Sequence, residues 1–173
     1  SLMVHNMTES QIINKLNDSE LDIEDLTDLI ERSYRIDCAV AASPLASAMI
    51  LDKLAHSCHI EVRYNVACND NTSDKTLIYL SKEFPKEFFE HPFFNLFLLD
   101  NPDLLKQLEP GTLKSYLNDP ACPDAFIKWA CYYGYKTDHL TILKRKNLTV
   151  EHLVIIANGR HPMTSERAIE RLI

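Results

Sequence analysis

The sequence predicts an all-α fold in which short helices form pairs and the pairs stack along the chain. Three observations predict it. A five-residue motif recurs along the chain, each copy is followed by the same apolar spacing, and only three of the 173 residues are glycine, which is few for an all-β fold. Recurrence at such intervals indicates structural repeats that bury their apolar faces against their neighbours. The copies of this connecting motif occupy residues 43–47, 69–73, 119–123, 146–150 and 161–165.

The spacing of the copies is almost regular. The first two start 26 residues apart and the third and fourth start 27 apart. The interval of 50 residues between the second and the third leaves room for one degenerate copy, and the fifth follows the fourth after only 15 residues. We therefore expect one poorly formed unit in the centre of the chain.

An apolar pair follows each connecting motif, four and seven residues after its last residue. Two apolar residues three positions apart mark one face of a helix. The pairs are Leu51 and Leu54, Leu77 and Leu80, Ile127 and Ala130, Val154 and Ala157, and Ile169 and Leu172. The sequence thus predicts a helix after each motif, with these pairs facing the core.

Residues that favour a helix N-terminus stand just before these pairs. Residues 72–73, Thr149 and residues 164–165 supply capping hydroxyls, and Pro123 falls where the first helical residue is expected. An acid follows in each of these four copies, at the positive end of the helix dipole. A capping box is not predicted, because its Glu or Gln is replaced by Lys75, Ala125, His152 and Arg167.

A second, shorter apolar pattern precedes the connecting motifs. It occurs at residues 36–41, 62–67, 113–117 and 140–143. Each unit is therefore expected to contain two short helices, and neither can bury its apolar side alone.

The unit from Val62 to Ser81 combines Val-Arg-x-x-Val-Ala, the motif Asn-Asp-Asn-Thr-Ser and an apolar helix. In this order the residues resemble the leucine-rich repeat variant family. The resemblance covers about residues 36–82 and 113–173. It implies a right-handed α-solenoid, a superhelix of about six short two-helix repeats forming a single domain over residues 8–173. Residues 84–111 fit only as a degenerate central repeat.

Charge is concentrated at the start of the chain. Residues 1–31 carry eight acids and one base, whereas the whole chain has a net charge of −7. We expect these acids to coat the solvated face of a terminal cap, with a docking surface for a basic partner as the alternative. Residues 1–7 are expected to be a tag remnant and a disordered start.

Localisation and partner class follow from hydropathy and charge. The sequence has no apolar run of membrane-spanning length and no secretory leader, so we expect a cytoplasmic, bacterial protein. A sequence pI of about 5.4 does not favour nucleic acid as the partner.

Two groups of residues are candidates for binding a protein or peptide. Tyr132, Tyr133 and Tyr135 follow Trp129 at an expected helix end, where three adjacent rings cannot all face inward. Tyrosines in such places are common contact anchors. The basic run of Lys144, Arg145 and Lys146 either contacts a phosphate or forms a solvated turn. Six of the seven phenylalanines lie at 84–97, where they fill the core or form an apolar partner patch.

Catalytic and metal-binding signals are weak. His56, Cys58 and His59 carry side chains that suit zinc, but their crowded spacing is more typical of a turn between helices. The chain has no Gly-x-Ser-x-Gly, no phosphate-binding glycine loop and no His-Glu-x-x-His. We therefore expect no cofactor, no resident metal and no enzymatic activity.

The sequence best predicts a non-enzymatic helical-repeat scaffold for a protein or peptide whose identity it does not give. One alternative is an accessory or structural subunit that completes another protein's assembly. The other is a metal-dependent or nucleic-acid-acting helical-repeat enzyme.

Overall fold

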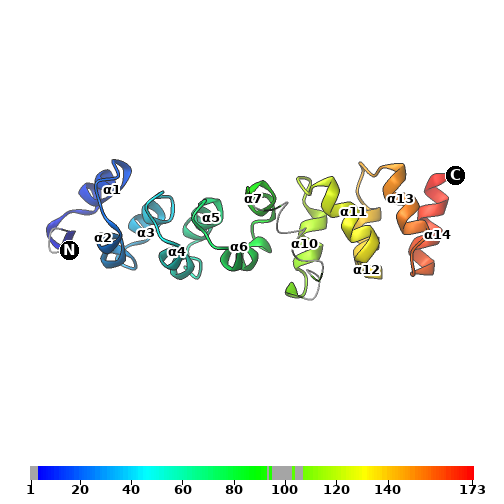
Figure 1. Ribbon diagram of the computed structural model, residues 1–173, viewed down its shortest axis with the longest axis horizontal. Helices are drawn as coiled ribbons and strands as arrows, with labels where there is room; N and C mark the ends of the chain where they lie inside the picture. The colour runs from blue at the N-terminus through cyan, green and yellow to red at the C-terminus, as the bar shows by residue number, and fades with distance from the viewer. Residues whose placement is uncertain (1–3, 93, 95–102, 104–106) are drawn as a thin grey trace. The chain divides into compact units, whose positions relative to one another are not determined.

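The computed structural model describes residues 4–92, 94, 103 and 107–173. Within these residues the chain forms twelve α-helices and one 3₁₀ helix and has no strand, which confirms the all-α class (Figure 1). The chain separates into two compact units, unit 1 (residues 1–92) and unit 2 (residues 93–173), where the sequence predicts one continuous domain. Each unit is described by itself. Residues 93, 95–102 and 104–106 of the expected degenerate repeat (residues 84–111) lie outside the described residues.

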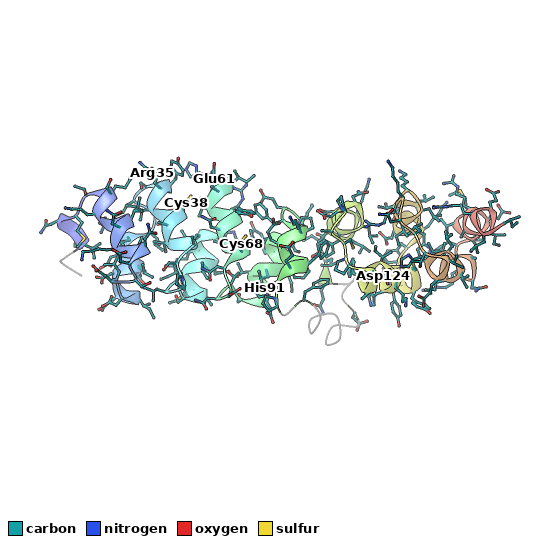
Figure 2. All side chains as sticks on the ribbon, turned by 90° about the horizontal axis from the view of Figure 1, so that it is seen from above. Arg35, Cys38, Glu61, Cys68, His91 and Asp124 are labelled. Atoms are coloured by element: carbon teal, nitrogen blue, oxygen red, sulfur yellow. The ribbon has the colours of Figure 1, made fainter. Side chains whose placement is uncertain are left out.

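Unit 1 contains short helices in two rows. Along one row α3 packs on α1 and on α5, and α5 packs on α7, while α4 and α6 lie in the other row (Figure 1). Equivalent residues therefore repeat along an edge: Arg35 of α3 and Glu61 of α5 project from the same side (Figure 2). The elements are η1 (Val4–Asn6), α1 (Glu9–Asn17), α2 (Ile23–Leu29), α3 (Tyr34–Ala41), α4 (Ala48–Leu54), α5 (Ile60–Cys68), α6 (Asp74–Ser81) and α7 (Pro85–Glu90).

Unit 2 has the same kind of packing between alternate helices. Here α12 packs on α10 and on α14, and α13 packs on α11 and on α14. The elements are α10 (Thr112–Asn118), α11 (Asp124–Tyr133), α12 (Lys136–Leu143), α13 (Val150–Ala157) and α14 (Pro162–Leu172). Every helix of the described residues is too short or too polar to cross a lipid bilayer.

Hydroxyl side chains begin three of the helices that follow a connecting motif. The side chains of Ser47, Ser73 and Thr149 each accept a hydrogen bond from the backbone N–H three residues later, at 3.3, 3.4 and 3.2 Å. Each such cap stabilises its helix by about 1 kcal/mol. The structure thus confirms the predicted caps at Ser73 and Thr149.

Distance from the N-cap decides which residues of these helices are buried. The third and seventh residues after the N-cap face the core in α4, α6, α11, α13 and α14. They are Ile50 and Leu54, Thr76 and Leu80, Phe126 and Ala130, His152 and Ile156, and Thr164 and Ala168. The predicted pairs following the first three motifs are buried as expected.

The predicted pairs of the last two motifs are wrong. Val154, Ile169 and Leu172 are 42%, 45% and 38% exposed. Because Thr149 is the N-cap of α13, its buried residues come one position earlier than the motif suggests. Because α14 already begins at Pro162, the expected capping hydroxyls at 164–165 lie inside that helix.

Two further predictions about helix starts need correction. Pro123 is the N-cap of α11 and not its first helical residue. A capping box is present in α13, since His152 replaces the usual Glu or Gln: its Nδ1 accepts a hydrogen bond from the Thr149 N–H at 3.1 Å. The other ring nitrogen, Nε2, lies 2.7 Å from Oδ1 of Asp124 and so links α13 to α11.

Side chains of one helix pair in unit 1 donate hydrogen bonds to carbonyls of the pair before it. Nδ2 of the buried Asn69 lies 2.8 Å from the Ala41 carbonyl and 2.9 Å from the Ser43 carbonyl. Asn71 reaches the carbonyls of Pro44 and Ala46 in the same way, at 2.8 and 3.1 Å. The Ala41 carbonyl lies at the end of α3, where a helix leaves carbonyls without an internal partner, and the other three carbonyls lie in the connection to α4.

Arginines make the equivalent bonds in unit 2. Nη1 of Arg145 lies 2.6 Å from the Leu117 carbonyl and 2.9 Å from the Asp119 carbonyl. Nη1 of Arg171 lies 2.6 Å from the Leu143 carbonyl. In both units the donor follows its acceptor by 25 to 28 residues, which is about one helix pair.

The ends of unit 1 differ in how well the sequence predicts them. Residues 4–7 were expected to be disordered, yet Val4 belongs to η1 and is fully buried, and Met7 packs against the same core. Six of the eight acids in residues 1–31 are exposed, in agreement with a solvated cap.

The core interpretation of the phenylalanines is confirmed where the structure describes them, at Phe84, Phe88, Phe89 and Phe94. Phe93 and Phe97 lie outside the described residues.

Candidate functional site

The three candidate tyrosines lie together on the surface of unit 2, as the sequence predicts. Tyr132 and Tyr133 are the last residues of α11, and Tyr135 is the N-cap of α12. Their exposed fractions are 60%, 58% and 63%. Gly134 separates them: its N–H donates the last helical bond of α11 to the Ala130 carbonyl at 2.8 Å, and its extended backbone conformation ends the helix.

A stack of rings connects these tyrosines to the core. Phe126 is fully buried and stacks on Trp129, with ring centroids 5.4 Å apart. Trp129 contacts Tyr133 at 5.7 Å, and Tyr133 contacts Tyr132 at 6.2 Å. Rings held in this way lose little conformational freedom when a partner covers them.

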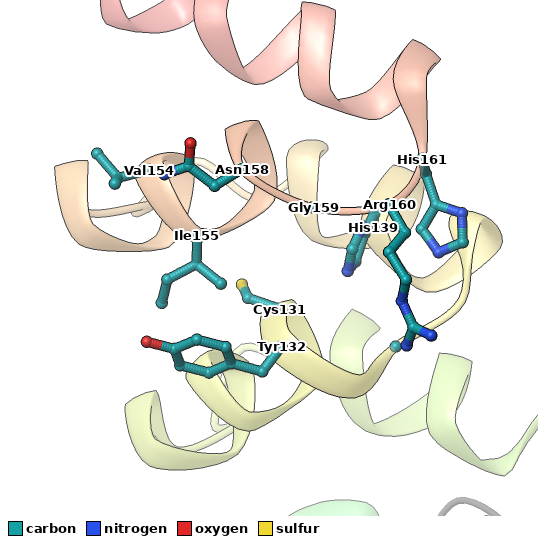
Figure 3. A pocket seen from close by; sticks show the side chains of 10 residues that line it. Cys131, Tyr132, His139, Val154, Ile155, Asn158, Gly159, Arg160 and His161 are labelled. Atoms are coloured by element: carbon teal, nitrogen blue, oxygen red, sulfur yellow. The ribbon is translucent and has the colours of Figure 1, made fainter.

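A cavity of about 340 Å³ opens beside Tyr132, between the end of α11 and the loop that joins α13 to α14 (Figure 3). Arg160, His161 and His139 gather on one side of it, whereas Tyr132, Val154 and Ile155 lie on the other. Cys131, Gly134, Asn158 and Gly159 complete the lining. The cavity therefore has one side that carries an arginine and two histidines and one side that is mainly apolar.

Two of the three glycines in the chain line this cavity; Gly134 leaves no space for a side chain, and Gly159 leaves little. A Cβ atom on Gly134 would lie 2.4 Å from the Ala130 carbonyl oxygen, a separation that requires the backbone to shift. A Cβ atom on Gly159 would lie 3.1 Å from the Ile156 oxygen and 3.7 Å from Cε1 of His139. The close packing of backbone here shapes the cavity.

His139 lies at the back of the cavity and is only 2% exposed. Neither ring nitrogen makes a hydrogen bond of good geometry, although the carbonyls of Cys131 and Ala130 are near. The His161 ring stands edge-on to it, with centroids 5.3 Å apart. Burial, and then the neighbouring His161, lower the pKa of His139. A buried polar group without a partner typically costs about 1–3 kcal/mol.

Cys131 does not have the character of a nucleophile. The side chain is 2% exposed, and its burial raises the pKa of the thiol to about 12. The reactive form of cysteine is the thiolate, which is scarce at neutral pH when the pKa is so high. Cys131 therefore does not supply a nucleophile to this cavity.

The basic run lies at the other end of α12 from the tyrosines, about 12 Å away at 1.5 Å per residue. Lys144 is the C-cap of α12, and Lys146 is exposed. The Arg145 guanidinium instead donates to carbonyls of the preceding pair. Arg145 and Lys146 also line a separate cavity of about 260 Å³. The structure does not bring the two predicted groups into one site.

The His and Cys residues considered as zinc ligands lie in the turn between α4 and α5 in unit 1. Nδ1 of His56 is 3.2 Å from the Tyr79 hydroxyl, and the His59 ring packs on Tyr34 with centroids 4.8 Å apart. Cys58 is exposed. Nowhere in the described residues do three or more His, Cys, Asp or Glu side chains come together as a metal site.

Sequence reasoning missed the cavity, because His139, Arg160 and His161 occur in no motif. The glycines at 134 and 159, which fall between predicted helices, are the one signal that pointed there. Comparison with protein families, curated proteins and solved structures finds no match to this chain. The candidate site therefore rests on its own geometry.

Proposed function

We propose that this protein is a non-enzymatic helical-repeat scaffold that binds a peptide segment of a partner protein on unit 2. The three exposed tyrosines beside an open cavity carry the proposal. Tyrosine and other aromatic residues dominate binding energy at protein interfaces, and binding cavities are usually apolar with a few convergent polar groups.

The proposed architecture is a right-handed α-solenoid of the leucine-rich repeat variant type. In support, the N-caps Ser47 and Ser73 lie 26 residues apart, as do Pro123 and Thr149. The hydrogen bonds between successive helix pairs also keep nearly this spacing. A stack of pairs offers an extended surface, which suits an extended ligand.

The size of the surface favours a peptide over a folded domain. A fully buried aromatic side chain contributes about 150–250 Å², so three tyrosines at about 60% exposure offer roughly 300 Å². A stable interface between folded proteins needs about 800 Å² from each partner. A short peptide that lies over the tyrosines and enters the cavity needs much less.

The test is selection of binders from a random peptide library, followed by measurement of Kd by fluorescence polarisation. The double variant Tyr132→Ala/Tyr133→Ala is expected to bind the selected peptides more than about tenfold more weakly. The matched control is Tyr34→Ala/Tyr79→Ala, which removes two tyrosines of similar exposure from unit 1. Failure to select any peptide, or equal affinity in the double variant, would refute the proposal.

A further inference from the structure

The charge of the cavity beside Tyr132 is unusual for this chain. Its lining contains one arginine and two histidines but no Asp or Glu, although the chain has 25 acids and a net charge of −7. The buried Asp138 lies close to both histidines but does not line the cavity, so the lining itself presents no acid to an anionic group. Arg160, the cation of this lining, is exposed and has no ion pair or hydrogen bond within the part of the chain that the structure describes.

The buried His139 gives a second, independent indication of a ligand. Both of its ring nitrogens lack a good hydrogen bond, whereas nearly all buried polar groups in proteins have one. His139 lines the cavity together with His161, whose ring stands edge-on to it (Figure 3). An anion held by Arg160 and His161 would place hydrogen-bond acceptors close to this buried ring.

The opposite wall of the cavity indicates what is attached to the anionic group. Val154, Ile155 and Tyr132 lie on the other side of the cavity from Arg160, His139 and His161 (Figure 3). A volume of about 340 Å³ suits one amino-acid residue of a ligand. The ligand therefore combines an anion with an apolar side chain on a small scaffold.

We infer that this cavity binds the C-terminal residue of a peptide, with its free carboxylate at Arg160 and His161 and an apolar side chain against Val154 and Ile155. This inference rests on the proposed function and names the end of the peptide that the site recognises. Since Tyr132 belongs both to the cavity and to the exposed tyrosines, the preceding residues of the peptide run over that surface. Phosphate fits less well, because a dianion would meet only one permanent positive charge and an apolar wall.

The experiment compares N-acetyl-leucine with N-acetyl-leucinamide, which differ only in the carboxylate. Binding is followed by ¹H–¹⁵N and histidine side-chain NMR on the full chain. We expect N-acetyl-leucine to shift the ring signals of His139 and His161, and to bind at least about tenfold more tightly than the amide. Acetate and inorganic phosphate, which lack the apolar part, should both bind more weakly than N-acetyl-leucine.

Arg160→Gln should lower the affinity for N-acetyl-leucine about tenfold or more. The matched control is Arg167→Gln, which removes an exposed arginine of α14 outside the cavity lining and should leave the affinity unchanged. Equal binding of the acid and the amide, equal losses in the two variants, or tighter binding of phosphate would overturn the inference.

These outcomes are separate from failure of the proposed function. If library peptides bind through the tyrosines with equal affinity as acids and as amides, the scaffold function stands and the carboxylate site is refuted. If N-acetyl-leucine binds in an Arg160-dependent way but no peptide is selected, the cavity stands as a carboxylate site for a small molecule. The proposal that the scaffold binds a peptide is then refuted.

Discussion

Replacing Asn69 by alanine removes three hydrogen bonds that one buried side chain makes in unit 1. Its Nδ2 donates to the Ala41 and Ser43 carbonyls, and its Oδ1 accepts from the Asn71 N–H at 2.9 Å. At about 0.5–1.5 kcal/mol for each net hydrogen bond, Asn69→Ala should lower the free energy of unfolding by about 1.5–4.5 kcal/mol. That is a large part of the total for a unit of this size.

Urea unfolding followed by far-UV circular dichroism measures this loss. Trp129, the only tryptophan of the chain, lies in unit 2, so its fluorescence reports on that unit and serves as an internal comparison. The matched control is Asn71→Ala, which removes two hydrogen bonds made by an exposed side chain and should cost less than about 1 kcal/mol. A loss below about 1 kcal/mol for Asn69→Ala would refute the role assigned to these bonds, and an equal loss for both variants would contradict the larger contribution expected from the buried side chain.

Three further predictions concern single residues. Arg145→Ala should destabilise unit 2 by about 1.5–3 kcal/mol in urea unfolding followed by Trp129 fluorescence, because it removes charged donors from two carbonyls, while Lys146→Ala should have little effect. Gly134→Ala should cost about 1–3 kcal/mol in the same assay, because its Cβ would overlap a carbonyl oxygen, and Gly159→Ala should cost less; equal costs would contradict the packing described. Burial raises the pKa of the Asp37 carboxyl above 3.8, so the folded state binds the carboxyl proton more tightly than the unfolded state does. The protonated carboxyl therefore contributes stability near pH 4, and this contribution is lost as the pH rises from about 4 through the folded pKa. Asp37→Asn should therefore raise the Tm at pH 7 and flatten the dependence of Tm on pH between 4 and 7; an unchanged profile would contradict this.

The sequence predicted helices where local chemistry and burial agree. Ser73 both caps α6 and stands at the correct distance from Leu77 and Leu80, so the motif and the N-cap give the same register. In α13 they disagree by one residue. The Thr149 side chain can cap a helix and the Val150 side chain cannot. Counting four and seven residues from Thr149 in place of Val150 would have placed Leu153 and Ile156 in the core.

The remaining features depend on contacts that leave no common pattern in the chain. Asn69 in unit 1 and Arg145 in unit 2 both donate hydrogen bonds to carbonyls of the preceding helix pair. Because they are different residue types, a search for repeated sequence does not detect them. His152 completes a capping box through an imidazole nitrogen, which the usual Glu or Gln rule does not include. The cavity near His139 arises from the packing of α11, α12 and the loop after α13, and no short stretch of sequence encodes it.

The direction of the bonds between helix pairs has a consequence for biosynthesis. The carbonyls at the end of α3 leave the ribosome before Asn69, which follows Ala41 by 28 residues. At about 5–20 residues per second, those carbonyls wait on the order of seconds for their donor. A nascent chain of this protein thus exposes an unfinished edge that each newly translated pair completes, and assembly proceeds in the direction of translation.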